Sequence, residues 1–480
     1  MKSIWRDDIE ISERERLNGD IKTQVAVIGG GLAGILTAYF LYKQGKEVVV
    51  LEAKNIGSGQ TQNTTAKITG QHNLIYNTLI QDFGLEKARQ YADANKKAIL
   101  EYKRIIEEEK IHCQFKVCPA YLYSQESSQS LEQEAQAAKQ AGLDCSLTTE
   151  TNLPFPVKAA LRFNSQAQFH PLAFLKAIAE PLTIYENTAA EQLDGNCVVT
   201  KYGNVTAEHI VIATHYPFLN VPGYYFMRMH QERSYVIALK NAMQINGMYL
   251  SVDKGGYSFR NSGDLLILGG GQHRTGENSL GGQYSKLRDA AKKFFPESIE
   301  VSHWSAQDCM TLDNVPYIGQ FSSSTQNWYV ATGFAKWGMT NSMISAMIIS
   351  DGILERQNSF APIFSPQRFK FSASAKTLVE DGIQAVKGLM TEIFTLPEEE
   401  INQLPKGHGG IVEYKGHKVG VYKDETGKAY IVSTRCTHLG CQLEWNPDEL
   451  SWDCPCHGSR FDYKGNLINN PAMENLNTIK

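Results

Sequence analysis

Residues 25–34 read Val25-Ala26-Val27-Ile28-Gly29-Gly30-Gly31-Leu32-Ala33-Gly34 and decide the fold of the larger part of this 480-residue chain. The apolar, mostly β-branched run Val25–Ile28 predicts a buried strand. The next segment, Leu32–Gln44, is rich in helix-forming residues and stops at Gly45, a common signal for a helix end. A second β-branched run at Glu47–Leu51 completes a strand–helix–strand unit.

The glycines of the first turn have the pattern of a dinucleotide site. Gly29 permits a tight turn, Gly31 lets the backbone approach a pyrophosphate, and Gly34 lets the helix pack closely on the strand. The helix N-terminus offers N–H donors to phosphate oxygens. Glu52 ends the second strand, where an acidic side chain binds a ribose hydroxyl. The unit is therefore expected to bind a dinucleotide cofactor.

Composition narrows the class of protein. Apolar residues make up 42% of the chain and charged residues 20%, which is typical of globular domains. A net charge of −4 gives no electrostatic basis for a nucleic-acid partner. Residues 1–20 lack the apolar core of a secretory signal, and no apolar run reaches about 18 residues. We therefore expect no transmembrane segment and a cytoplasmic location.

Further patterns divide the chain into regions. Apolar runs at Ile210–Ala213 and Trp328–Ala331 predict two more buried strands of the first sheet. A mixed β domain is expected as an insertion between them, with strands at Tyr235–Leu239, Met248–Val252, Tyr257–Arg260 and Leu265–Leu268. Helical spacing of apolar residues predicts amphipathic helices over 85–110 and Thr377–Phe394. From about Pro397 the chain changes to short strands and turns.

Four of the nine cysteines lie close together near the C-terminus. They form two motifs with histidine, Cys436-Thr437-His438-Leu439-Gly440-Cys441 and Cys454-Pro455-Cys456-His457-Gly458-Ser459. Two thiolates on one iron and two imidazoles on the other are the ligand set of a Rieske-type 2Fe–2S cluster, and each motif supplies one ligand of each kind. Zinc also binds cysteine and histidine. Zinc has no need of Cys441 and Cys456, so the motifs favour the cluster.

The two motifs resemble the Rieske domain family. The metal ligands that this resemblance implies are Cys436, His438, Cys454 and His457. It also implies a disulfide between Cys441 and Cys456, with two reduced thiols as the alternative, and a hydrogen bond from Ser459 to a bridging sulfide. High-potential members carry a tyrosine where this chain has Phe461. One hydrogen bond to a ligand sulfur is then missing, so we expect a lower potential than in the Rieske proteins of cytochrome bc complexes.

A second resemblance covers about residues 20–355. It rests on the fingerprint at 25–34, the strand Ile210-Val211-Ile212-Ala213-Thr214, the segment Asp313-Asn314-Val315-Pro316-Tyr317-Ile318-Gly319 and a late glycine turn. These pieces are similar to the D-amino-acid oxidase-like family of FAD-dependent oxidoreductases. In that family FAD lies across a Rossmann-like domain, with the substrate over the flavin ring beneath a β-sheet domain.

The resemblance also implies which residues bind FAD. The loop 57–69 resembles the family segment along the pyrophosphate and ribityl chain, and a plain Ser/Thr loop is the alternative. The implied FAD-binding residues are Gly29, Gly31, Gly34, Glu52, Thr61, Thr65, Ala66, Lys67, Gly333, Gly338, Met339 and Thr340.

Together the patterns predict an α/β plus all-β fold. A Rossmann-like FAD-binding domain with an inserted mixed β-sheet substrate domain is followed by a small Rieske β domain, and the expected cofactors are FAD and a Rieske-type 2Fe–2S cluster. The expected boundaries are 1–80 (first part of the FAD-binding domain), 81–200 (mixed helical and substrate region), 201–223 (FAD-binding strand), 224–305 (substrate β domain), 306–356 (last part of the FAD-binding domain), 357–396 (linker and helix) and 397–480 (Rieske domain).

The architecture resembles bacterial FAD-dependent oxidoreductases fused to a C-terminal Rieske domain. The resemblance implies an enzyme similar to amine or amino-acid dehydrogenases, whose reduced flavin passes electrons singly through the cluster to an external one-electron carrier. Two alternatives stay open: a ferredoxin-fed flavin reductase that runs in the opposite direction, and a redox-sensing protein with little turnover. No pair among the twelve histidines has the spacing of the iron ligands of Rieske oxygenases, so the sequence argues against an oxygenase. A second fingerprint at Gly269–Gly271 would need glycine where the chain has Arg274, so the sequence also argues against a nicotinamide site.

Five residues are candidates for the substrate site: Lys336, Trp337, Arg274, Tyr257 and Arg260. The first two follow Gly333 and are expected near the flavin ring, with packing as the alternative role. The guanidinium of Arg274 suits a substrate carboxylate, with a surface loop as the alternative, and the last two are expected to line the inserted β domain. Cys309 lies near the position of covalent flavin attachment in some relatives, but its spacing to Asp313 differs, so the sequence favours non-covalent FAD.

Overall fold

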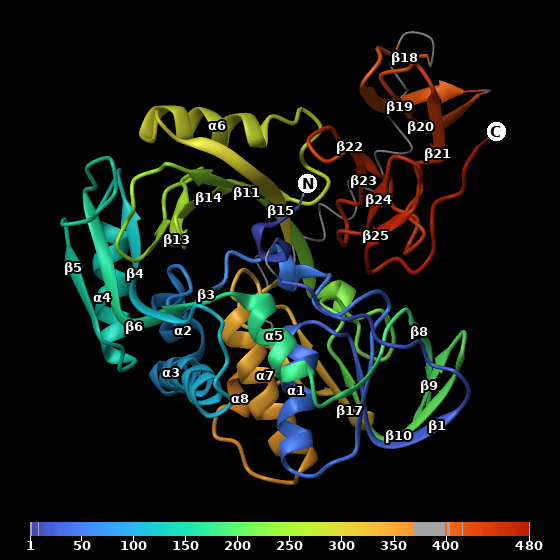
Figure 1. The fold of residues 1–480 in the computed structure, drawn as a ribbon, viewed down its shortest axis with the longest axis horizontal. Helices are drawn as coiled ribbons and strands as arrows, with labels where there is room; N and C mark the ends of the chain where they lie inside the picture. The colour runs from blue at the N-terminus through green and yellow to red at the C-terminus, as the bar shows by residue number, and fades with distance from the viewer. Residues whose placement is uncertain (1, 8, 369–398, 401–403, 415, 480) are drawn as a thin grey trace.

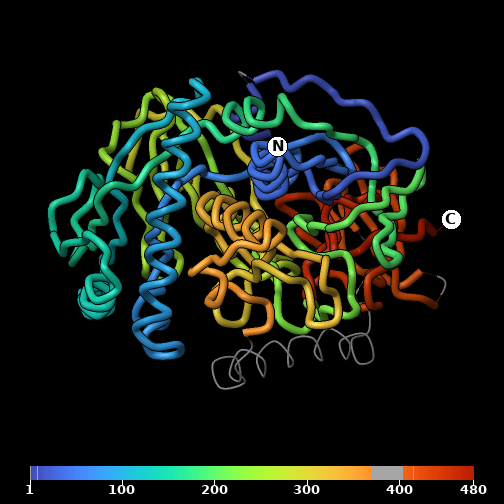
Figure 2. Tube along the Cα trace, turned by 90° about the horizontal axis from the view of Figure 1, so that it is seen from below, coloured from blue at the N-terminus to red at the C-terminus, as the bar shows by residue number. Residues whose placement is uncertain are grey.

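The computed structural model describes residues 2–7, 9–368, 399–400, 404–414 and 416–479. A sheet flanked by helices lies below a second sheet, and two small sheets of the C-terminal region lie beside the second sheet (Figure 1). Figure 2, seen from below, shows the long helix α3 (Leu85–Glu108) on one side and the C-terminal region, in red, on the other.

The first sheet has eight strands and contains the expected strand–helix–strand unit. Strand β1 (Ile21–Ile28) leads through α1 (Leu32–Lys43) to β2 (Val48–Leu51) and pairs with it in parallel. On its other side β1 pairs in parallel with β10 (Gly203–Ile212), which pairs in parallel with β17 (Thr325–Thr332). The centre of β1 is fully buried, as a continuous apolar strand in a parallel sheet requires. The other strands are β7 (Thr183–Tyr185), β8 (Ala190–Asp194), β9 (Cys197–Thr200) and β16 (Tyr317–Ser322).

Helices cover this sheet. Helix α1 packs against α7 (Gly338–Ile353), and α3 confirms the amphipathic helix expected over 85–110, with Tyr91 and Tyr102 buried. The remaining helices are α2 (Ile75–Phe83), α4 (Gln129–Gln140), α5 (Pro171–Ala179), α6 (Gln283–Phe294) and α8 (Ala361–Phe364), and the 3₁₀ turns are η1 (Ile4–Arg6), η2 (Gln60–Asn63) and η3 (Tyr225–Met227). Within the described part of the chain, no helix is both long and apolar enough to span a bilayer.

The second sheet is mixed and has nine strands. Its expected strands are β11 (Met229–Lys240), β12 (Met248–Ser251), β13 (Ser258–Ser262) and β14 (Leu265–Arg274). The sheet also takes β3 (Lys67–Ile68), β4 (Lys116–Ser124), β5 (Cys145–Thr148), β6 (Ala159–Gln168) and β15 (Ile299–Thr311). It therefore extends beyond the expected 224–305 on both sides, because β12 pairs in parallel with β4, a strand more than a hundred residues earlier.

The C-terminal region consists of two four-stranded sheets. The first holds β18 (Glu399–Glu400), β19 (His408–Tyr414), β20 (His417–Lys423) and β21 (Ala429–Ser433), and the second holds β22 (Glu444–Asn446), β23 (Ser451–Asp453), β24 (Arg460–Asp462) and β25 (Leu467–Asn469). Trp445, Trp452 and Phe461 are buried with the four C-terminal cysteines. The helix expected at Thr377–Phe394 lies outside the described residues.

Candidate active site and metal centre

The turn between β1 and α1 requires glycine at two positions. Gly29 has φ +112°, and a Cβ there would lie 2.5 Å from the carbonyl oxygen of Ala213. A Cβ at Gly34 would overlap the carbonyl oxygen of Gly29. Among the described residues, a Cβ at Gly31 would have one non-adjacent neighbour within 4 Å, Thr61 Oγ1 at 3.6 Å. That oxygen accepts a hydrogen bond from the N–H of Leu32 in the first turn of α1. The start of α1 is therefore open to a pyrophosphate, which fits FAD.

Glu52 stands beside this turn at the end of β2. Its Oε2 accepts a hydrogen bond from the N–H of Gly30 at 2.7 Å, and its Oε1 accepts one from the N–H of Lys54 at 2.8 Å. Burial raises the pKa of Glu52, and the two backbone donors counteract part of this rise. The carboxyl group is thus fixed beside the open turn, where a ribose hydroxyl of a dinucleotide would meet it.

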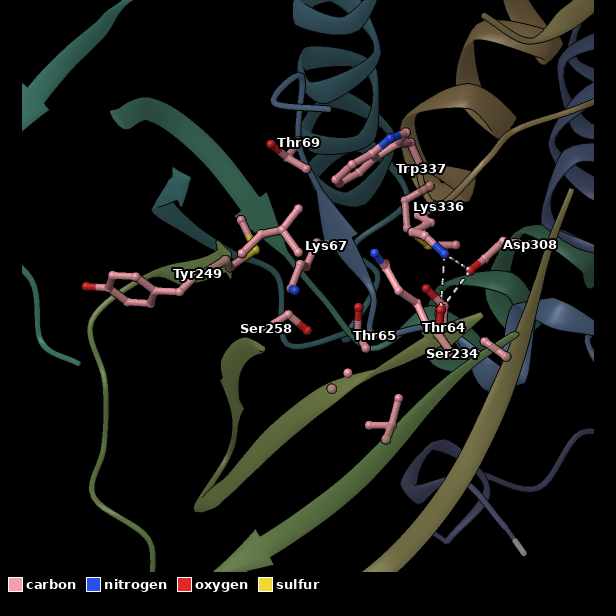
Figure 3. A pocket seen from close by; sticks show the side chains of 18 of the residues that line it. Thr64, Thr65, Lys67, Thr69, Ser234, Tyr249, Ser258, Asp308, Lys336 and Trp337 are labelled. Carbon is pink, nitrogen blue, oxygen red and sulfur yellow. Dashed lines mark hydrogen bonds and ion pairs between the residues drawn. The ribbon is translucent and has the colours of Figure 1, made fainter. Parts of the chain in front are cut away.

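A cavity opens between the second sheet and the N-terminus of α7 (Figure 3). Its empty volume is about 960 Å³, part of it open to solvent. Lining residues include Thr64, Thr65, Lys67 and Thr69 around β3, Lys336, Trp337 and Met339 at the turn into α7, and Ser234, Tyr249, Ser258, Gly269, Gly270 and Asp308 from the sheet. Five residues expected from the sequence meet here: Thr65, Lys67, Lys336, Trp337 and Met339.

Lys336 is a cation of this cavity, and carboxylates balance its charge. Its Nζ lies 3.0 Å from a carboxylate oxygen of Glu232. It also lies 3.1 Å from a carboxylate oxygen of Asp308 and donates a hydrogen bond to Ser234 Oγ at 3.2 Å (Figure 3). Burial alone would lower the pKa of Lys336, but the two carboxylates raise it, so the ammonium stays protonated. Lys336 therefore joins the turn before α7 to β11 and β15. The two acidic partners had not been singled out in the sequence, because no motif surrounds them.

Lys67 is the second cation of the cavity, and it differs from Lys336. Among the described residues, no hydrogen bond or ion pair reaches its Nζ, and burial together with the neighbouring Arg260 lowers the pKa of Lys67 to about 7. The guanidinium of Arg260 is buried and donates hydrogen bonds to the carbonyl oxygens of Thr65 at 2.8 Å and Ala66 at 2.7 Å. Arg260 thus holds the loop that presents Lys67, and Lys67 exchanges a proton near neutral pH.

Three of the five substrate-site candidates do not line the cavity. Arg260 holds the loop as described, and the Tyr257 ring packs against Phe294, with ring centroids 6.4 Å apart. Arg274 ends β14 and donates hydrogen bonds to the carbonyl oxygens of Pro455 at 3.1 Å and Cys456 at 3.4 Å. Its guanidinium faces the C-terminal region because Gly269–Gly271 continue the strand, where a loop had been expected.

The sequence had given no signal for His72. Its ring stacks on Trp337 with centroids 4.6 Å apart, and its two nitrogens lie 2.6 Å from the hydroxyl of Tyr91 and 2.7 Å from the carbonyl oxygen of Thr69. Burial lowers the pKa of His72 to about 3, so the ring is neutral. The neutral ring packs against the Trp337 ring. The thiol of Cys309 is buried and does not line the cavity, and burial raises its pKa to about 12.

The sequence-predicted metal ligands come together at one end of the C-terminal region. Cys436 and His438 lie between β21 and β22, and Cys454 and His457 lie between β23 and β24. The two imidazole rings have centroids 5.0 Å apart at 88°. A hydrogen bond with the Cys454 thiol, offset in part by burial, lowers the pKa of Cys436 to about 7. The side chain of Ser459 also hydrogen-bonds Cys436.

The donor set fits a cluster with two sulfur and two nitrogen ligands. Nδ1 of His438 is buried and has no hydrogen-bond partner in the described part of the chain, as a nitrogen kept for iron would be. Cys441 and Cys456 form a disulfide. Their sulfurs lie close to that of Cys454, but the disulfide removes them as thiolate ligands. The arrangement thus matches a Rieske centre better than a zinc site of four cysteines.

Comparison with known proteins identifies both parts of the chain. A family model for FAD dependent oxidoreductases matches residues 24–352, and a model for the Rieske [2Fe-2S] domain matches residues 395–480. The chain belongs to the FAD-dependent oxidoreductase family. It carries a Rieske domain in addition, and its cofactors are FAD and a 2Fe–2S cluster. The expected fold class is confirmed.

Similar proteins support the same assignment. The Rieske 2Fe-2S iron–sulfur protein YhfW of Bacillus subtilis is 37% identical over 495 aligned positions, which cover 100% of this chain and 97% of YhfW. Glycine oxidase from Geobacillus kaustophilus superposes with a TM-score of 0.61 at 17% identity, covering 73% of this chain and 99% of that enzyme. L-Proline dehydrogenase from P. horikoshii gives 0.60 at 20% identity, covering 74% and 98%. At these identities the two solved structures show the fold alone.

In this FAD-dependent oxidoreductase the Rieske domain docks on the strands that line the cavity. Gln231 of β11 donates a hydrogen bond from Nε2 to the carbonyl oxygen of His457 at 2.7 Å. Gln307 of β15 donates one to the carbonyl oxygen of Gly458 at 2.6 Å. Both glutamines are buried. The second ligand loop is therefore held directly by the FAD-binding part of the same chain.

A buried ion pair reinforces the contact. Arg233 of β11 binds Glu449 of the Rieske domain, with side chains only 3% and 5% exposed. Glu449 also pairs with Arg460 at 3.1 Å. Burial alone would raise the pKa of Glu449, but the two guanidinium groups hold it at about 2. The interface thus contains charges that are paired and desolvated.

Proposed function

We propose that this enzyme oxidises an amine or amino acid at FAD and delivers the electrons one at a time through its own Rieske cluster to an external acceptor. When bound, FAD accepts two electrons from a C–H bond next to nitrogen, and the Rieske cluster carries one electron at a time. Glycine oxidase and L-proline dehydrogenase, whose structures superpose on this chain, are both named after an amino acid, which favours this substrate class.

The main support for this proposal is that side chains alternate between two partners along β11 and β15. On β11, Gln231 and Arg233 contact the Rieske domain, whereas the residues between and after them, Glu232 and Ser234, contact Lys336 at the cavity. Successive side chains of a strand point to opposite faces of the sheet. One layer of sheet thus separates the cavity from the ligand loop, a short path for electrons.

The same alternation occurs on β15. Ser305 donates a hydrogen bond to Glu449, and Gln307 donates one to the carbonyl oxygen of Gly458, both in the Rieske domain. Asp308, in contrast, pairs with Lys336 and lines the cavity. The two strands are paired over their whole length. Two adjacent strands therefore form one wall, with the cavity on one side and the Rieske domain on the other.

The substrate would enter the cavity beside Lys67. Oxidation of an amine needs the substrate nitrogen in its neutral form, so a proton must leave it. Lys67 Nζ has no acidic partner among the described residues and titrates near pH 7, so it can take up that proton. The carboxylates of Asp308 and Glu232 are occupied by Lys336.

An anaerobic reduction experiment tests the proposal. N-methylated amines, amino acids and NADH are added separately to the holoenzyme, and flavin bleaching and the Rieske EPR signal are recorded on the same samples. We expect one amine or amino acid to bleach the flavin, followed by the EPR signal. If reduced ferredoxin reduces the protein and nothing on the panel does, electrons run in the opposite direction and the proposal is wrong.

The acceptor is tested separately. Because the cluster passes single electrons, turnover with a one-electron acceptor such as ferricenium should be faster than peroxide formation from oxygen. Faster peroxide formation would reject the relay through the cluster.

A further inference from the structure

The imidazole of His438 meets a residue of the FAD-binding part of the chain. Its Nε2 lies 2.9 Å from Oδ1 of Asn220, in the segment between β10 and β11. Nδ1 of the same ring is buried and, within the residues described, has no hydrogen-bond partner. One nitrogen therefore faces an amide oxygen of the other domain, and the second is kept for a metal.

This contact defines the proton position on the ring. A neutral imidazole has one N–H, and a carbonyl oxygen can only accept a hydrogen bond. The proton therefore belongs on Nε2 of His438, and Nδ1 presents the lone pair that iron needs. Metal-bound histidines commonly donate their other N–H to a carboxylate or a carbonyl oxygen, which fixes the ring and raises its basicity.

We propose that Asn220 is a positioning residue for the Rieske cluster: the FAD-binding domain supplies the outer hydrogen bond that orients His438 and adjusts the reduction potential. The inference rests on the Rieske centre and not on the direction of electron flow proposed above. It makes the properties of the cluster depend on domain docking.

The surroundings hold Asn220 in place. Its backbone carbonyl accepts a hydrogen bond from the N–H of Tyr224 at 2.9 Å. Phe226, three residues before the start of β11, stands edge-on to both ligand rings, with centroids 6.5 Å from His438 and 5.8 Å from His457. The segment between β10 and β11 thus packs against both imidazoles and brings the Asn220 acceptor to His438.

The sign of the effect on potential follows from ligand basicity. An imidazole that donates its N–H to an acceptor is a richer electron donor to the metal, and a richer donor stabilises the oxidised cluster. Asn220 therefore lowers the reduction potential. Removal of the acceptor should raise it, and a stronger, negatively charged acceptor should lower it further.

The test is a redox titration of the full-length holoprotein, followed by EPR, on Asn220→Ala and Asn220→Asp. We expect Asn220→Ala to raise the midpoint potential and Asn220→Asp to lower it, each by up to a tenfold change in the ratio of oxidised to reduced cluster, about 59 mV for one electron. Asn246→Ala is the matched control, since Asn246 is an exposed asparagine before β12, and it should leave the potential unchanged.

Each outcome decides the proposal. Shifts of opposite sign for the two variants support it, and so does cluster loss in Asn220→Ala alone, because Asn220→Asp keeps an acceptor oxygen. Equal behaviour of the two variants, whether an unchanged potential, the same shift or loss of the cluster, overturns it. The titration needs no substrate, so a failure of amine oxidation would not be mistaken for a failure of this inference.

Discussion

The ion pair between Arg233 and Glu449 offers a direct test of how firmly the Rieske domain is docked. Arg233→Met removes the FAD-side cation while keeping a long apolar side chain. Glu449 then loses a partner whose Nε donates to its Oε2 at 3.0 Å, but it retains Arg460 at 3.1 Å. The variant therefore weakens the contact between the domains without leaving the carboxylate wholly unpaired.

The magnitude follows from burial. Removing one partner of a buried ion pair costs about 3–5 kcal/mol. Both side chains are at most 5% exposed, so solvent screening gives little relief, and the remaining Arg460 places the cost near the lower end. A loss of about 3 kcal/mol in docking corresponds to a roughly 100-fold larger undocked population.

Hydrogen exchange measures this change without any assumption about electron flow. Protection of the amides in 454–460 should fall by up to about 100-fold in Arg233→Met, because this segment is hydrogen-bonded to β11 and β15 at His457 and Gly458. Flavin-to-cluster electron transfer after photoreduction should slow in parallel, with the Rieske EPR signal retained. The matched control is Arg288→Met, whose ion pair with Glu300 is half-exposed and worth at most about 1 kcal/mol. Unchanged protection and an unchanged rate in Arg233→Met would refute the argument that this pair docks the domain.

Three further changes test the cavity, the Rieske centre and the glycine turn. Lys67→Met removes an amine whose pKa falls from 10.5 to about 7 on folding. The buried ammonium therefore lowers the free energy of unfolding, and this loss is complete below pH 7 and disappears by about pH 10.5. In thermal denaturation of the FAD-free protein, the variant should therefore be more stable than the parent at pH 6 by roughly 2 kcal/mol, because solvent in the open cavity screens part of the pKa shift. This difference in stability should vanish by about pH 10.5. A difference that does not depend on pH would contradict the argument. Phe461→Tyr adds a hydroxyl at a fully buried position and should raise the midpoint potential in protein-film voltammetry, whereas an equal or lower value would sink the hydrogen-bond argument. Gly34→Ala should abolish FAD absorbance and spare the Rieske EPR signal, because its Cβ overlaps the carbonyl oxygen of Gly29; retained stoichiometric FAD would be the contrary result.

Local spacing made much of the fold predictable. The glycine turn at 25–34 and the two cysteine–histidine motifs work only if their residues stand at fixed separations, so a short window contains the whole signal. The second sheet was predictable only in its middle. Its strand β4 pairs with β6 and, in parallel, with β12, and such pairings between distant segments leave no local pattern.

The candidate substrate site was partly predictable for a similar reason. Lys336 and Trp337 had been expected at the substrate site and Lys67 had been expected to bind FAD, and all three line the cavity. Arg274 was expected in a loop because glycines precede it. In the structure Gly269 and Gly270 pair with β11 as strand residues, and after a bulge His273 and Arg274 pair with β11 again. The strand thus carries the guanidinium to the Rieske domain.

The part of the sheet that separates the cavity from the Rieske domain has a sequence signal of its own, which hydrophobicity does not reveal. Gln231-Glu232-Arg233-Ser234 and Ser305-Ala306-Gln307-Asp308 place polar side chains on both faces of a sheet. A strand with one face on an apolar core alternates polar with apolar residues, so polarity on both faces requires a polar partner on each side. Here the partners are Lys336 on one face and the Rieske ligand loop on the other. Substitutions at Gln231 and Gln307 should therefore alter electron transfer without altering substrate affinity, whereas substitutions at Asp308 should do the reverse.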